Sequence, residues 1–127
     1  MYLTHAINES PTIYGEAGVN LTAPAMKVVA FNADGKFVLP GSGYPIGVVL
    51  ADAADIDAGD RVNVQIKDIC YALAGEAVKR GDMLKAHTDG TVKRAAAGNV
   101  VIGIALGNAA ENKPVEMMIV HTVAPAA

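Results

Sequence analysis

IGVVLADAA, the stretch at residues 46–54, returns in altered form as IGIALGNAA at residues 102–110. The two stretches lie 56 positions apart and share the same residue at five positions, namely Ile, Gly, Leu, Ala and Ala. A glycine inside a strand often marks a bulge or a place where another backbone approaches closely. We therefore expect Gly47 and Gly103 to be structural glycines at corresponding corners of two related strands.

The similarity continues on both sides of these stretches. Upstream, Asp34-Gly35 matches Asp89-Gly90 at an offset of 55 residues, and this dipeptide is typical of hairpin turns. Downstream, residues 62–66 loosely match residues 115–119. A hairpin, an Ile-Gly strand, a small-residue turn and another strand thus occur twice, which is too few copies for a solenoid and predicts a pseudo-symmetric barrel or sandwich. The pseudo-repeats cover about residues 28–66 and 83–120.

Strand patterns dominate the chain after residue 25. Residues 61–67, RVNVQIK, alternate strictly between apolar and polar side chains, which predicts a half-buried strand. Shorter runs between turn signals predict further strands at residues 27–31, 36–39, 46–50, 69–73, 83–86, 91–93, 100–106 and 115–123. Helical turns are expected only at residues 52–58 and 109–112. The fold class is therefore mainly β, with residues 26–127 forming one small compact β-barrel or sandwich.

The first 25 residues differ from the rest. They mix polar and apolar residues without a sustained period and are interrupted by Pro and Gly, which predicts an extended N-terminal arm. The arm is too apolar for a purely solvated tail. We expect it to dock on a partner through five apolar side chains: Tyr2, Leu3, Ile7, Ile13 and Tyr14.

Composition excludes several classes of function. The chain has 13 acidic and 10 basic residues, a formal net charge of -3, which argues against a nucleic-acid partner. It is 52% hydrophobic but only 18% charged, against about 25% for an ordinary domain, which indicates surface hidden against a partner. No membrane segment and no secretory signal are apparent, and the one cysteine, Cys70, lies in an apolar run. We expect a buried thiol and synthesis in a reducing cytoplasm.

No catalytic, cofactor or metal site is predicted. Residues 41–47, GSGYPIG, lack the glycine spacing and the following helix that a phosphate loop requires. The acidic residues between Asp52 and Asp60 have an Asp where a calcium loop needs glycine, and no closing Glu. The three histidines are far apart in sequence and lack metal-ligand spacing. A basic group is interpreted as a solvated face or an interface rim: Lys79, Arg80, Lys85, Lys93 and Arg94.

Four segments of the second half carry a family resemblance. They are AGEAVKRGDML at residues 74–84, DGTV at 89–92, IGIALGNAA at 102–110 and residues 115–120. In this order they resemble the small capsid decoration, or cement, proteins of tailed bacteriophages, in which a Gly-Asp turn, a hairpin and an Ile-Gly strand follow one another. Residues 46–54 and 59–66 resemble the same pattern more weakly.

The resemblance implies a head-stabilising structural protein without an active site or cofactor. Such proteins are made in the bacterial host cytoplasm and bind the outer capsid surface of the virion, typically as homotrimers near three-fold positions, where they clamp adjacent capsomers. The implied partners are the major capsid protein and other copies of the chain, and the arm is the expected capsid-binding segment. Two alternatives stay open, another virion subunit such as a tail or spike protein, and a small ligand-binding β-barrel.

Overall fold

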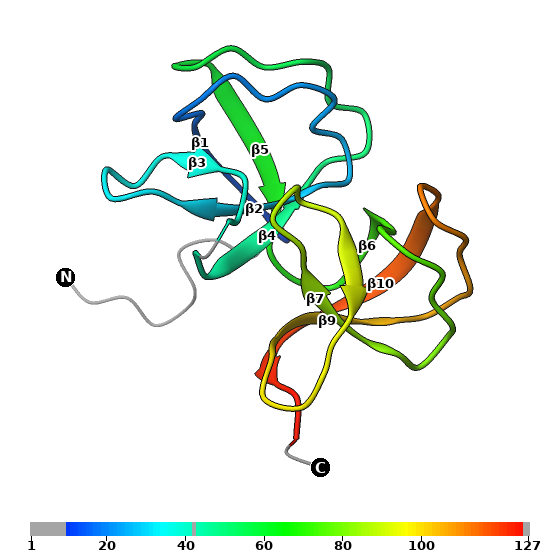
Figure 1. Ribbon diagram of the computed structural model, residues 1–127. Helices are drawn as coiled ribbons and strands as arrows, with labels where there is room; N and C mark the ends of the chain where they lie inside the picture. The colour runs from blue at the N-terminus through cyan, green and yellow to red at the C-terminus, as the bar shows by residue number, and fades with distance from the viewer. Residues whose placement is uncertain (1–9, 42, 126–127) are drawn as a thin grey trace, which may run out of the picture.

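The computed structural model describes residues 10–41 and 43–125, which form two antiparallel five-stranded sheets (Figure 1). The first half of the chain contains β1 (Thr12–Glu16), β2 (Val28–Phe31), β3 (Phe37–Val38), β4 (Pro45–Val49) and β5 (Arg61–Gln65). The second half contains β6 (Ile69–Leu73), β7 (Met83–Ala86), β8 (Val92–Arg94), β9 (Val100–Ala105) and β10 (Pro114–Val123). The fold is all-β and sandwich-like, and its strands do not close into a barrel.

The two halves are copies of one unit. The strand order is β1-β5-β4-β2-β3 in the first sheet and β6-β10-β9-β7-β8 in the second, so each strand corresponds to the one five places later. The registers correspond too. In the first sheet Val28 pairs with Val48. At the same place in the second sheet Met83 pairs with Ile104. The internal repeat predicted from the sequence is therefore confirmed.

The repeat begins earlier in the chain than the sequence predicted. β1 lies within the expected arm but pairs antiparallel with β5, as β6 pairs with β10. After β1, Ala17 bridges to Phe37, and after β6, Ala74 bridges to Val92. From residue 10 onward the expected arm is thus part of the first half, and residues 1–9 lie outside the described chain.

Alternation of side chains explains the strands and their burial. In β5 the side chains of Val62 and Val64 are buried, whereas Arg61 and Asn63 face solvent. No helix occurs in the described ranges, so the expectation of helical turns near residues 52–58 and 109–112 is wrong. Those segments instead carry one isolated bridge each, Leu21 to Ile56 and Val78 to Ala109.

Each half has its own cluster of buried side chains, and the cluster of the second half also includes side chains from the first half. Phe37, Val62 and Val64 belong to the core of the first half. Val28 and Val48 come from strands of the first half, yet they pack into the core of the second half. The core of the second half therefore extends across the boundary between the two sheets.

Candidate functional site

The two glycines predicted from the repeat occupy equivalent places in β4 and β9. A Cβ on Gly103 would lie 2.5 Å from Met117 Cγ and 2.7 Å from the Met118 carbonyl oxygen. A Cβ on Gly47 would collide with the Gln65 carbonyl oxygen and lie 2.7 Å from Val64 Cγ1. In each half the missing side chain lets the Ile-Gly strand lie close to its neighbour, so these glycines shape the sheets.

Of the five apolar residues assigned to a capsid-binding arm, Tyr2, Leu3 and Ile7 lie outside the described residues. The other two are in β1, a strand of the chain's own sheet. Ile13 is half-buried and packs against the core of the first half, so much of its surface is not available to a partner. Tyr14 is 69% exposed, and the Arg61 guanidinium lies 4.0 Å from its ring centroid. Tyr14 is thus the described arm residue best placed to meet a partner.

An exposed apolar patch on the second half was missed by the sequence analysis. Ile69 and Met118 are cross-strand partners and are 56% and 38% exposed. Tyr71, two residues along β6, is 53% exposed and corresponds to Tyr14 in the first half. We call these three side chains the β6 patch.

The signal for the β6 patch was present in residues 69–73, ICYAL. Strand alternation places Cys70 and Ala72 on one face and Ile69 and Tyr71 on the other. The small side chains, Cys70 and Ala72, are buried in the core of the second half together with Val28 and Val48, and the large ones lie outside. A sequence rule that sends the largest apolar residues inward predicts the opposite.

The titratable groups do not converge on a reactive centre. Burial raises the pKa of the Cys70 thiol to about 12, so this cysteine is a poor nucleophile at neutral pH. The His121 ring stacks near Tyr44, at 6.2 Å between centroids. In the described ranges no three His, Cys, Asp or Glu side chains lie close enough to share a metal ion. Nor does any helix there have the length and apolarity to span a membrane.

Two ion pairs lie at the surface of the described residues, Lys36–Glu16 and Arg94–Glu76. Glu76 accepts hydrogen bonds from the Arg94 backbone N–H, at 2.8 Å, and from Arg94 Nε, at 3.4 Å. The backbone bond is the main reason that the Glu76 pKa is lowered. The basic group of the second half thus includes one residue that is already paired.

Two hollows lie along the boundary between the halves. One, of about 450 Å³, is lined by residues that include Tyr44, Lys85 and Asn99. The other, of about 350 Å³, runs from Val48–Asp52 past Gln65 to Ile69 and Tyr71, two members of the β6 patch. The second hollow is also lined by Cys70, whose pKa burial raises to about 12, and among the described residues no histidine lines either hollow.

Comparison with known proteins finds a family model and similar solved structures. The family model described as "phage cement protein" matches residues 14–120, which include nearly all ten strands. Among solved structures, the chain is similar to the N base of the head fiber gp8.5 of bacteriophage phi29. The TM-score is 0.69 at 24% identity, over 88% of this chain and 95% of that one, which shows a shared fold. No curated protein sequence matches the chain.

Proposed function

Since the chain belongs to the phage cement protein family, a family of capsid-associated structural proteins, we propose that it binds the outside of an assembled phage capsid and clamps adjacent capsomers. The proposal includes a homotrimer near three-fold positions and no catalytic role. The observation that carries it is the family match over residues 14–120, because this match spans both halves. The capsid partner is the major capsid protein, and the site of action is the outer surface of the virion.

The β6 patch supplies a surface that suits this role. Its three side chains lie on an edge strand and its neighbour, where β6 has no second partner strand in the sheet order. Contiguous exposed apolar side chains mark protein interaction sites more often than scattered ones do. Aromatic anchors such as Tyr71 contribute much of the binding energy in such interfaces.

The N-terminal segment is the second proposed contact. Tyr2, Leu3 and Ile7 are apolar and precede the folded unit, and Tyr14 extends the apolar surface onto β1. An extended peptide can add a strand to an exposed sheet edge of a partner. Three such segments in one trimer would raise the effective affinity well above that of one segment.

Co-sedimentation with expanded capsid shells tests both contacts. The informative deletion removes residues 1–9, because a longer one would also remove β1 and disrupt the first half. We expect this deletion and Tyr71→Lys each to lower occupancy at least tenfold. Val123→Lys is the matched control, since Val123 is also an exposed apolar residue, at 57%, but lies outside both the arm and the β6 patch.

Each contact can fail separately in this experiment. Undiminished occupancy after deletion of residues 1–9 would remove the arm from the proposal, and undiminished occupancy with Tyr71→Lys would remove the β6 patch. A wild-type chain that does not sediment with shells would contradict the proposed function itself.

A further inference from the structure

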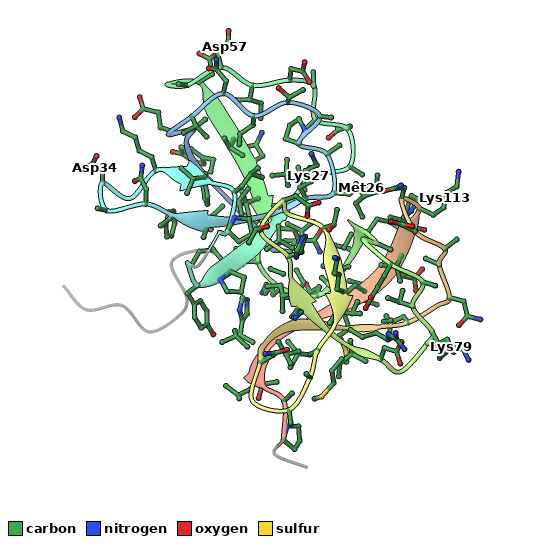
Figure 2. The ribbon with its side chains drawn as sticks, viewed as in Figure 1. Met26, Lys27, Asp34, Asp57, Lys79 and Lys113 are labelled. Atoms are coloured by element: carbon green, nitrogen blue, oxygen red, sulfur yellow. The ribbon has the colours of Figure 1, made fainter. Side chains whose placement is uncertain are left out.

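Backbone hydrogen bonds cross the boundary between the halves, and one of them is made by the β7–β8 turn. The Val28 backbone N–H donates to the Gly90 carbonyl oxygen at 2.7 Å, and the Leu73 N–H donates to the Met26 carbonyl oxygen at 2.9 Å. Gly90 is buried, and a Cβ there would lie 2.9 Å from Lys27 Cβ. In Figure 1 this turn reaches from the second half into the first, close to Lys27 as labelled in Figure 2.

The reverse contact, in which the β2–β3 turn of the first half would dock on the second half, is absent from the described residues. The repeat register equates four pairs of positions: Gly90 with Gly35, Lys27 with Asp82, Val28 with Met83 and Leu39 with Arg94. Gly35 is exposed, and a Cβ added to it would have nothing within 4 Å. Figure 2 shows its neighbour Asp34 pointing away from the second half. The β2–β3 turn, residues 32–36, is therefore a free turn.

The surface that would receive this turn is also open. It is a recess of about 510 Å³ whose lining residues all belong to the second half: Glu76, Asp82, Met83, Arg94, Ala95 and Ala96. In the first half the Gly90 turn contacts the equivalent surface at Lys27, Val28 and Leu39. We call the uncovered one the free recess. A two-fold relation between the halves would have filled both surfaces, so the halves are related head to tail.

The free turn already has the backbone conformation of the turn that docks. Gly35 N–H donates to the Asn32 carbonyl oxygen at 3.0 Å, and Asn32 N–H donates to the Lys36 carbonyl oxygen at 2.8 Å. The docked turn has both bonds at the equivalent residues, His87, Gly90 and Thr91. Both glycines have positive φ, 74° and 89°. Docking would thus require little reordering of the backbone, which lowers its entropic cost.

Both basic side chains of these two surfaces are already paired within the chain. Lys36 of the free turn lies 3.3 Å from Glu16, and Arg94 of the free recess lies 3.4 Å from Glu76, which also lines the recess. The match therefore rests on the backbone conformation of the turn and on the open recess, not on charge.

We propose that copies of this chain associate head to tail, with the free turn of one copy seated in the free recess of the next. The contact between chains would repeat the contact between the two halves of one chain. This inference rests on the proposed self-association and names the surfaces that carry it. A head-to-tail contact closes into a ring when its rotation permits, which is compatible with a homotrimer.

Disulfide trapping without capsids tests the direction of the contact. One variant carries Ala33→Cys, at an exposed position in the free turn, and another carries Ala96→Cys, exposed at the free recess. After mild oxidation we expect linked dimers only when the two variants are mixed. The native Cys70 is buried and does not compete. Dimers in either variant alone, or none in the mixture, would overturn the proposal.

A bulky side chain introduced at the free recess tests the contact in a second way. We expect Ala96→Trp to raise the dissociation constant of the oligomer at least tenfold in native mass and light-scattering measurements. Ala110→Trp is the matched control, because Ala110 is exposed in a turn away from the recess. An unchanged oligomer with Ala96→Trp, or a wild-type chain that stays monomeric at all concentrations, would overturn the head-to-tail contact. Capsid binding is measured separately, so failure of the proposed function is distinguishable.

Discussion

Gly47 and Gly103 act at the scale of single atoms, because each stands where a neighbouring strand leaves no room for a methyl group. At Gly103 the neighbours include the buried Met117 side chain and a backbone oxygen. At Gly47 they are a backbone oxygen and a branched, buried valine, neither of which can move as easily as a methionine. Added volume in a packed core forces side chains and backbone to shift.

We therefore predict that Gly103→Ala lowers the free energy of unfolding by about 1–3 kcal/mol. Gly47→Ala should cost at least as much, because its neighbours are stiffer. Gly107→Ala is the matched control, since nothing lies within 4 Å of a Cβ there, and it should change stability by less than about 0.5 kcal/mol. Urea unfolding measures all three. Equal stability of the Gly103 and Gly107 variants would contradict the role assigned to the close approach.

The elements show what a sequence pattern can and cannot reveal. The sequence predicts the ends of the strands after residue 25 to within two residues, because apolar runs, their alternation and the turn residues between them are local properties. β1 was missed because Gly15 interrupts its pattern and Glu16 ends it. The available signal was comparison with β6, since Tyr14, Ala17 and Gly18 recur as Tyr71, Ala74 and Gly75.

The two hairpin turns differ in how they are held. In the β7–β8 turn Asp89 accepts hydrogen bonds from Thr91, at 2.6 Å from Oγ1 and 3.0 Å from the backbone N–H. In the β2–β3 turn Asn32 accepts instead, from the backbone N–H groups of Asp34 and Lys36. Burial alone would raise the pKa of Asp89, but the two Thr91 hydrogen bonds outweigh it, so the pKa lies below its ordinary value of 3.8.

We predict that Asp89→Ala lowers the free energy of unfolding by about 1–2 kcal/mol at neutral pH, because the buried Thr91 hydroxyl loses its acceptor. Asp34→Ala is the matched control at the equivalent position and should be nearly neutral, since Asn32 holds that turn. A lowered folded-state pKa stabilises the protein above the ordinary Asp value, and this contribution is lost as the pH falls through the folded-state value.

Denaturation of the wild type and of both variants across the acid range gives the check. The gap between wild type and Asp89→Ala should be constant near neutrality and narrow as the pH falls below about 3.8. A gap that is independent of pH would show that the Asp89 carboxylate is not the group responsible.

At the scale of the whole molecule, the sequence predicts the duplication but not the contact between its two copies. The sequence predicted two copies from identical short stretches, and the copies share strand order and register. It could not predict how the copies meet, because equivalent residues have different roles. Gly90 is buried in a contact while Gly35 is exposed, and nothing in the Asp-Gly dipeptides distinguishes them. The two glycines differ in burial only because of how one half is placed on the other.

The core that the two halves share leads to a prediction about the cooperativity of unfolding. Val28 and Val48 belong to strands of the first sheet but pack with Leu84, Ile102 and other core residues of the second half. The second half therefore loses part of its core if the first half unfolds, and we expect both halves to unfold together.

Val62→Ala tests this coupling, because Val62 is buried in the core of the first half only. The substitution should destabilise the first sheet by roughly 1–3 kcal/mol. If the halves unfold as one unit, hydrogen exchange of the most protected amides should accelerate by the same factor in β9 as in β5, since both then report global unfolding. Exposed substitutions such as Asp34→Ala should leave both unchanged. Acceleration confined to β1–β5 would mean that the second half stays folded without its neighbour, and that Val28 and Val48 contribute little to its core.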